Sequence, residues 1–169
     1  MSKDINVFTD GSTLNNQKVG KRKGGVGVFF ADNDPRNISL PLEEKGNQKV
    51  TNQVAELLGC ILAIETLIKT QKIGTKKINI FTDSMYIVNI INTWGKNWEK
   101  NNWKKSDGKN VDNLDLVKRL FYLSTNIKTK FTHVKSHQKE PSKSDPEYYI
   151  WYGNSKADEL AVNASKSIL

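Results

Sequence analysis

The sequence predicts an α/β fold with one five-stranded mixed sheet, an antiparallel three-strand meander plus parallel strands, and with helices on both faces. Two observations support this prediction. Three strand-like segments come first along the chain, which favours an antiparallel meander. Strand and helix patterns then alternate, so that the order βββαβααβα includes the crossovers of a parallel sheet. Because the chain shows no repeat or interdomain linker, residues 1–169 are expected to form a single domain.

The three strands of the meander are expected at residues 5–9, 24–31 and 38–42. Residues 5–9 alternate apolar and polar side chains and stop at Asp10, as a half-buried strand does. The polar and basic residues 12–23 are interpreted as a loop, and Asn33-Asp34-Pro35 as a turn.

The later elements follow from helical spacing and from short apolar runs. Helices are expected at 51–69, 84–92, 113–125 and from 154 to the end, and strands at 77–82 and 129–134. Two segments break these patterns. One is a basic, tryptophan-containing protrusion at about 93–112, and the other is a long polar loop at about 138–153.

The composition narrows the class of partner. A net charge of +8 and a sequence pI of about 9.5 favour an anionic partner, with nucleic acid first among the candidates. The alternative is that the lysines only keep the protein soluble. Cys60 is the single cysteine, which excludes an intramolecular disulfide and fits a reducing intracellular compartment, cytoplasm or nucleus. The sequence has no membrane-spanning run and no secretory leader, so we expect no membrane partner. We also expect a monomer.

Two aspartates end similar strands. The segments INVFTD (5–10) and INIFTD (78–83) each run from apolar residues to an aspartate. Because ligands of open α/β sheets bind at the carboxyl ends of the strands, Asp10 and Asp83 are candidates for one shared site. The alternative for Asp83 is a simple cap of the helix that follows.

Glu56 and Asp158 are the other candidate acids. Glu56 lies early in the first helix, above the apolar residues Cys60 and Ala63 on its own side. A carboxylate in such a position is costly unless it is paired or binds a metal, but an exposed acid near a helix N-terminus is an equal alternative. For Asp158, its spacing from Ser155 also fits a capping box.

Clustered carboxylates repel one another unless cations neutralise them. Oxygen ligands suit Mg²⁺ or Mn²⁺, and two such ions about 4 Å apart can activate a water and stabilise the leaving oxygen of a phosphodiester. His137 follows the last strand and could move protons near neutral pH, although a lone loop histidine is more often inert. Acids for metals and basic residues for phosphates together indicate a nuclease.

At this point the sequence resembles the type 1 ribonuclease H family. The matching segments follow the family order over nearly the whole chain: FTDGS (8–12), GGVGV (24–28), TNQVAELLGCILAIE (51–65), FTDS (81–84), the stretch 94–109, HVKSH (133–137) and NSKADELA (154–161). The resemblance implies the family's fold and its catalytic domain alone, without an amino-terminal hybrid-binding module.

The resemblance also implies roles for individual residues. The four metal-binding acids fall on Asp10, Glu56, Asp83 and Asp158, and the mobile histidine that assists proton transfer or product release falls on His137. The implied contacts with RNA are Asn52 and Gln53 on the minor groove, Thr13 and Asn16 in a loop that touches RNA, and Asn154, which helps to place the substrate before the last acid. The implied contacts with DNA are Thr51 and Asn113 around a phosphate, with Lys49 as a further candidate there, and Tyr86, Trp94 and Trp98 along the strand.

Two segments leave alternatives open. The tryptophans of the protrusion could contact DNA or pack the protrusion onto the body, and we expect Trp103 in the core and Trp94 and Trp98 in mixed roles. The segment between His137 and Asp158 is longer than the family's usual link and is rich in aromatic residues. We expect its aromatic end to dock on the body, with substrate contact as the alternative.

The expected function is therefore hydrolysis of the RNA strand of RNA–DNA hybrids, with two Mg²⁺ ions or Mn²⁺ in their place, leaving 5′-phosphate and 3′-hydroxyl ends. Two alternatives remain. One is a hybrid-binding protein without cleavage, although all four acids are present. The other is a DNA-acting nuclease of the same fold, although Asn52, Gln53 and the protrusion point away from it.

Overall fold

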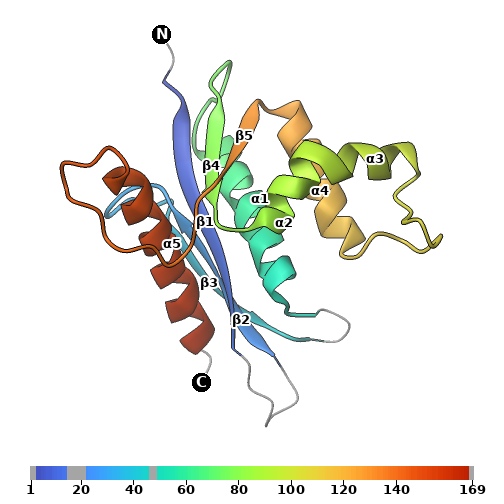
Figure 1. Ribbon diagram of the computed structural model, residues 1–169, viewed down its shortest axis with the longest axis horizontal. Coiled ribbons are helices and arrows are strands. Elements are labelled where there is room, and N and C mark those ends of the chain that lie inside the picture. Colours follow the sequence, from blue (N-terminus) through green and yellow to red (C-terminus); the bar gives the residue numbers. More distant parts are fainter. Residues whose placement is uncertain (1–2, 15–21, 46–48, 168–169) are drawn as a thin grey trace.

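The computed structural model describes residues 3–14, 22–45 and 49–167 (Figure 1). Its sheet has five strands in the order β3-β2-β1-β4-β5. The first three strands form the predicted antiparallel meander, and the other two run parallel to the central strand β1. The strands are β1 (Ile5–Leu14), β2 (Lys23–Phe29), β3 (Ile38–Glu43), β4 (Ile78–Thr82) and β5 (Thr129–His133).

The helices cover both faces of the sheet, as predicted (Figure 1). Helix α5 packs on one face, chiefly on β2 and β1, while α1 packs on the other face with α4 beside it. The helices are α1 (Asn52–Thr70), α2 (Met85–Asn89), α3 (Gly95–Lys100), α4 (Leu114–Asn126) and α5 (Tyr148–Lys166), with a π-helical turn at Ile90–Trp94. In the described part of the chain, none of these helices has the length and hydrophobicity that a bilayer crossing requires.

The central strand separates two cores because its successive side chains point to opposite faces of the sheet. Val7 is fully buried among residues of α1, including Leu57 and Ile61. Phe8 is fully buried on the other face with Phe29 and Ala157. A strand that is buried on both sides has little freedom to shift, so β1 is a rigid support for Asp10, which lies two positions after Phe8 in the same strand.

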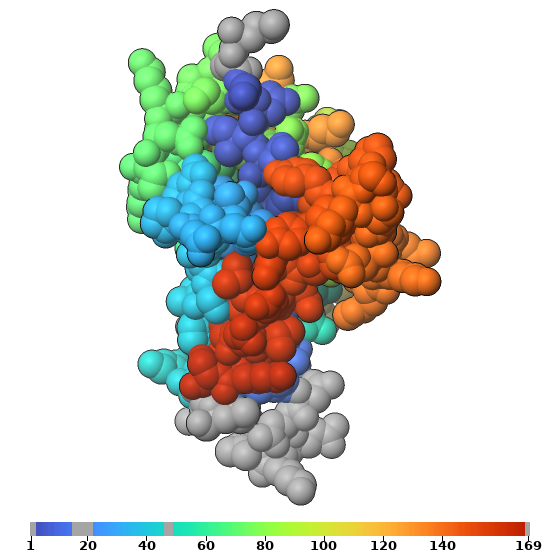
Figure 2. Space-filling model, turned by 90° about the vertical axis from the view of Figure 1, so that its left-hand side faces the viewer, coloured from blue at the N-terminus to red at the C-terminus, as the bar shows by residue number. Residues whose placement is uncertain are grey.

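Glycines bring α5 unusually close to the sheet. A Cβ added at Gly27 would lie 2.1 Å from the carbonyl oxygen of Ala157, and one at Gly25 would lie 2.1 Å from that of Ala161. Only residues without a side chain fit at these two positions of β2. The backbone of α5 therefore lies almost directly on β2, and Figure 2 shows the helix (red) covering this face.

Three predicted boundaries are wrong. Strand β1 continues through residues 12–14 into the predicted loop, because the backbone of these residues still pairs with residues 23–25 of β2. The predicted break at 93 is also absent, because the helical turns continue to Lys100. Helix α5 begins at Tyr148 instead of 154, within the predicted loop.

Candidate active site

Asp10 and Glu56 meet at a single backbone amide. The N–H of Gly11 donates to Oδ1 of Asp10 at 2.8 Å and to Oε1 of Glu56 at 3.2 Å. This contact needs a glycine, because a Cβ at Gly11 would lie 2.7 Å from the Cβ of Ala55 in α1. The two carboxylates are 4% and 8% exposed as residues, so the exposed-acid alternative for Glu56 is wrong.

Asp83 joins them through the register of the parallel strands. Thr9 of β1 lies opposite Thr82 of β4, and each is followed by an aspartate. Asp10 within β1 and Asp83 directly after β4 therefore lie next to each other. One carboxylate oxygen from each of Asp10, Glu56 and Asp83 lies within 4.8 Å of the other two. The capping alternative for Asp83 is wrong, since Ser84 caps α2 by accepting from the N–H of Ile87.

Asp158 approaches the same cluster from the opposite face of the sheet. It follows Ala157, whose carbonyl lies against Gly27, and it lines the same pocket as the other three acids. Because α5 begins at Tyr148, Ser155 lies inside the helix, and its hydroxyl donates to the carbonyl of Tyr152 at 2.8 Å. The capping box proposed for Ser155 and Asp158 is therefore wrong.

The cluster resists ionisation in the absence of cations. Burial, followed by the charges of Glu56 and Asp83, raises the pKa of Asp10 far above its usual range. Burial, followed by the charge of Asp83, raises the pKa of Glu56 to about 8. Burial also raises the pKa of Asp83. Each added negative charge makes the next one more costly.

A divalent cation would remove this cost. The donor set consists of carboxylate oxygens, which are the ligands that hard cations such as Mg²⁺ and Mn²⁺ prefer. Among the described residues, Oε2 of Glu56 is buried and has no hydrogen-bond partner. An unpaired buried carboxylate oxygen is unfavourable, and a cation would satisfy it. The residues present therefore fit a metal site.

The acids line a pocket of about 450 Å³ that also contains the predicted RNA-contacting residues. Asn52 and Gln53 are exposed in the first turn of α1, on the rim of this pocket. Thr13 donates its hydroxyl to Oδ1 of Asn52 at 2.6 Å, which joins the end of β1 to the start of α1. Thr51 caps α1 by accepting from the N–H of Val54. Asn16 lies outside the described residues.

Aromatic residues line a second hollow of about 200 Å³ beside this pocket. Tyr86 borders both spaces, and its ring lies 6.3 Å from that of Trp94, which in turn lies 5.8 Å from that of Trp98. Gln53 also lines both, so the two spaces adjoin. Asn113 donates its side-chain amide to the hydroxyl of Tyr86 at 3.5 Å.

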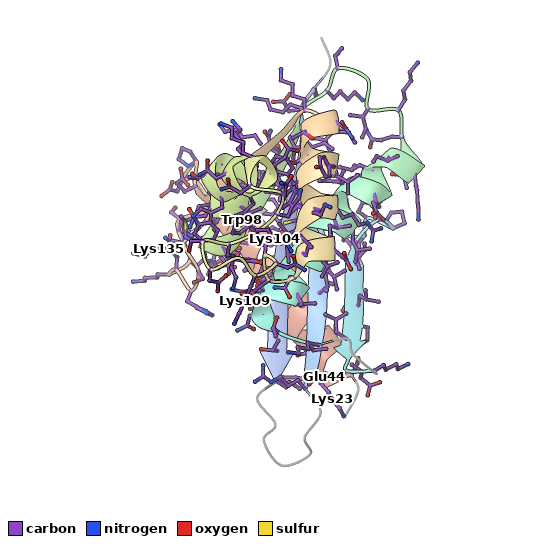
Figure 3. All side chains as sticks on the ribbon, turned by 90° about the vertical axis from the view of Figure 1, so that its right-hand side faces the viewer. Lys23, Glu44, Trp98, Lys104, Lys109 and Lys135 are labelled. Atoms are coloured by element: carbon purple, nitrogen blue, oxygen red, sulfur yellow. The ribbon has the colours of Figure 1, made fainter. Side chains whose placement is uncertain are left out.

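The tryptophans divide as predicted. Trp103 is 7% exposed and belongs to the core, whereas Trp94 is 38% exposed and Trp98 is half-buried. Trp94 and Trp98 line the hollow together with Lys105, and Trp98 borders a further hollow with Lys104. Figure 3 shows Trp98, Lys104 and Lys109 in the same part of the molecule.

His137 lies between the acid pocket and a groove of about 480 Å³ that runs between the end of β5 and α5. The groove is also lined by Asp83, Asn154 and Asp158. Asn154 is 9% exposed, and its Oδ1 is buried without a partner among the described residues. Both predicted residues therefore lie beside the acids, although they come from different elements.

Sequence reasoning missed several residues that line these spaces. Met85 and Ser136 border the acid pocket, and Met85 is 47% exposed. His133 and Trp151 border the groove. Met85 directly follows the FTDS segment, and His133 and Ser136 lie within the HVKSH segment, which was the one available signal. Nothing in the sequence pattern indicates that Trp151 would reach His137's loop.

Comparisons with known proteins agree with this geometry. A model of the RNase H family matches residues 2–166. The chain is 37% identical over 155 residues to Ribonuclease H of Schizosaccharomyces pombe, covering 92% of this chain and 50% of that protein. It is 36% identical over 169 residues to Ribonuclease H of Pseudoalteromonas atlantica, covering 99% and 95%. The chain thus spans about half the length of the fission yeast, rat and human relatives.

The fold has solved counterparts. The structure of LC11-RNase H1 in complex with RNA/DNA hybrid is similar with a TM-score of 0.58 and 20% identity, covering 98% of this chain and 99% of that one. At that identity the likeness concerns the fold. The family match over almost the whole chain, together with relatives more than 30% identical, identifies the protein: it belongs to the type 1 ribonuclease H family.

Proposed function

We propose that this chain is an endoribonuclease that hydrolyses the RNA strand of RNA–DNA hybrids by two-metal-ion catalysis, giving 5′-phosphate and 3′-hydroxyl ends. The observation that carries the proposal is the cluster of Asp10, Glu56 and Asp83, whose oxygens lie within 4.8 Å of one another in an open pocket. The relatives named Ribonuclease H and the related RNase H1 in complex with RNA/DNA hybrid support the reaction and the substrate.

Four carboxylates would hold the metal: Asp10, Glu56 and Asp83 in the cluster, and Asp158 beside them. Bound Mg²⁺, or Mn²⁺ in its place, supplies an activated water and neutralises charge on the scissile phosphate. The chain's own part is to hold the oxygens in place. The Gly11 N–H orients both Asp10 and Glu56, and the rigid strand β1 sets the position of Asp10.

His137 is proposed to move a proton. Its exposed side chain borders the acid pocket, where an imidazole nitrogen could protonate the leaving oxygen or assist product release. Asn154, buried beside it on α5, would help to place the substrate.

Different residues would contact the RNA strand and the DNA strand of the hybrid. The amides of Asn52 and Gln53 can donate to and accept from the 2′-hydroxyl, the group that distinguishes RNA from DNA, and Thr13 orients Asn52. Tyr86, Trp94 and Trp98 offer aromatic surfaces for the DNA strand, while neighbouring lysines neutralise its phosphates. Thr51 and Asn113 are proposed to contact a DNA phosphate.

The test is cleavage of matched RNA–DNA hybrid, duplex RNA and duplex DNA, each with and without Mg²⁺. We expect cleavage of the RNA strand of the hybrid alone, and only with metal. Asp10→Asn should lower kcat by at least about 100-fold, the scale on which loss of a preorganised electrostatic group acts, while hybrid binding remains. Binding without cleavage by the unaltered chain would indicate a hybrid-binding protein, and cleavage of duplex DNA a DNA-acting nuclease.

A further inference from the structure

A hydrogen bond between two distant elements holds the loop that carries His137. The indole N–H of Trp151, in the first turn of α5, donates to the backbone carbonyl of Gln138 at 3.1 Å. Gln138 directly follows His137 in the chain. The contact therefore restrains the backbone next to the histidine and not the imidazole itself.

The other end of the same loop is held by the sheet. The N–H of Val134 donates to the carbonyl of Thr82 at 2.8 Å, directly after β5. Residues 135–137 thus lie between one attachment on β4 and another on α5. His137 has φ of 55°, in the left-handed region that side chains other than glycine rarely adopt. Such a conformation persists only where its surroundings hold it, and Trp151 is a described group that does so.

The first turns of α5, which carry Trp151, are themselves held by contacts with the sheet and with the turn after β2. Tyr152 donates its hydroxyl to Asp32 at 2.6 Å, and its ring lies 6.0 Å from that of Phe29. The ring of Tyr149 lies 5.5 Å from that of Phe8. The first turns of α5 therefore dock on the body, as predicted for the aromatic end of this segment, and Figure 2 shows them beside the turn between β2 and β3.

Trp151 also shares a helix face with the candidate metal ligand. Asn154 and Asp158 follow Trp151 by three and seven positions, a spacing that places side chains on one face of a helix. All three line the groove beside His137. One rigid helix thus sets both the position of Asp158 and the attachment of the histidine's loop.

We propose that Trp151 is a positioning residue, whose indole N–H fixes the loop so that the His137 imidazole is held over the edge of the acid cluster. The proposal rests on the proposed function, because it gives Trp151 an effect only through a histidine that takes part in the reaction.

The decisive variant is Trp151→Phe, which keeps an aromatic ring and removes the N–H donor. We expect kcat on RNA–DNA hybrid to fall about 5-fold, the scale of one ordinary interaction, with KM changed less than about 2-fold. Tyr152→Phe is the matched control, because it removes a hydrogen bond from the next residue of α5 but keeps the ring that packs on Phe29, so the first turns of α5 stay docked and the loop is not touched. It should lower the melting temperature but leave kcat unchanged.

The role is isolated by repeating the substitution in a His137→Ala background. If Trp151 acts through His137, the double variant should have the kcat of His137→Ala alone. Proton and nitrogen NMR of the unbound protein should show broadened or shifted signals for residues 135–138 in Trp151→Phe and unchanged ones in Tyr152→Phe.

Several outcomes would overturn the proposal: an unchanged kcat in Trp151→Phe, an equal loss in Tyr152→Phe, or a loss that persists in the His137→Ala background. An unaltered chain that does not cleave hybrid would instead refute the proposed function, and the positioning role with it. If the unaltered chain cleaves hybrid and Trp151→Phe is equally active, the positioning role is refuted but the proposed function is not.

Discussion

Asp10 lies within a strand that is buried on both faces, and its carboxylate has other acids around it. This position explains why its pKa, and that of Glu56, is raised. A carboxylate that is protonated in the folded state and ionised in the unfolded state opposes folding as the pH rises. This loss of stability applies to the site without bound cations. It can be measured directly, without an activity assay.

We therefore expect stability without divalent cations to fall with rising pH. The unfolded chain releases its carboxyl protons near pH 4, whereas folded Glu56 retains its proton to about pH 8. The folded state thus binds more protons between these values, and stability falls through this window. The melting temperature in EDTA should drop at least about 2–4 °C from pH 5 to pH 8, which corresponds to about 1 kcal/mol.

Two further measurements identify the cause of that drop. Mg²⁺ at pH 8 should restore most of the lost stability, because it binds the folded state only. Asp10→Asn in EDTA should show a shallower dependence on pH, since one negative charge has been removed from the cluster. An equal slope in both proteins would show that other groups titrate.

Thr13 is expected to act on substrate binding through Asn52. Its hydroxyl donates to Oδ1 of Asn52 and so leaves the amide N–H groups free to face the pocket. Thr13→Val removes this hydrogen bond and should raise KM for the hybrid about 5-fold, the scale of one ordinary interaction, with little change in kcat. Thr13→Ser keeps the hydroxyl and should behave like the unaltered chain in steady-state kinetics. A loss confined to kcat would contradict this role.

At the scale of the elements, the site depends on how closely two helices approach one strand pair. α1 reaches β1 through Gly11, which places Glu56 beside Asp10. α5 reaches β2 through Gly25 and Gly27, which places Asp158 at the same edge from the opposite face. Each approach leaves no room for a Cβ, so both helices are held at a defined height above the sheet.

Alanine at two of the buried glycines should have opposite effects. Gly27→Ala forces α5 away from β2, and we expect a loss of about 1–3 kcal/mol in the free energy of unfolding, together with lower activity. Gly59→Ala is the matched control inside α1, because its Cβ would meet atoms at 3.5 Å, an ordinary contact. It should stabilise the helix by about 0.5–1 kcal/mol. Urea unfolding measures both, and a neutral Gly27→Ala would show that α5 can move freely.

At the scale of the whole molecule, acids and bases are separated. The acidic cluster lies beside the middle of β1 and the carboxyl end of β4, while the segment after α3 carries exposed lysines such as Lys109 (Figure 3). A net charge of +8 therefore coexists with a local concentration of carboxylates. This separation suits a polyanion that is attracted by a wide basic surface and reacts at the acidic cluster.

The basic segment should determine how hybrid binding depends on salt. Lys109→Gln is expected to weaken hybrid binding and to reduce the slope of log K against log salt by about 1, whatever the hybrid's sequence. Lys69→Gln is the control, because Lys69 lies in the last turn of α1, about 25 Å along the helix from Asn52. Fluorescence anisotropy with Mg²⁺ replaced by Ca²⁺ would measure both slopes, and equal slopes would argue against binding at this segment.

The sequence by itself determined the order of the elements, the sheet composition and the candidate acids. Paired strand-end aspartates and helical periodicity depend on contacts between near neighbours in the chain, which a sequence pattern records directly. It did not reveal that β1 continues through residues 12–14, because a backbone can pair without apolar side chains.

Only the tertiary structure decided which local alternatives hold. Ser155 and Asp158 fit a capping box in sequence, but the first turns of α5 are stabilised by aromatic packing on Phe8 and Phe29, so the helix begins earlier. The bond from Trp151 to Gln138 likewise exists because both ends are held elsewhere. Such contacts depend on the distance between elements, and that distance is set by glycines whose role appears only when the helix lies against them.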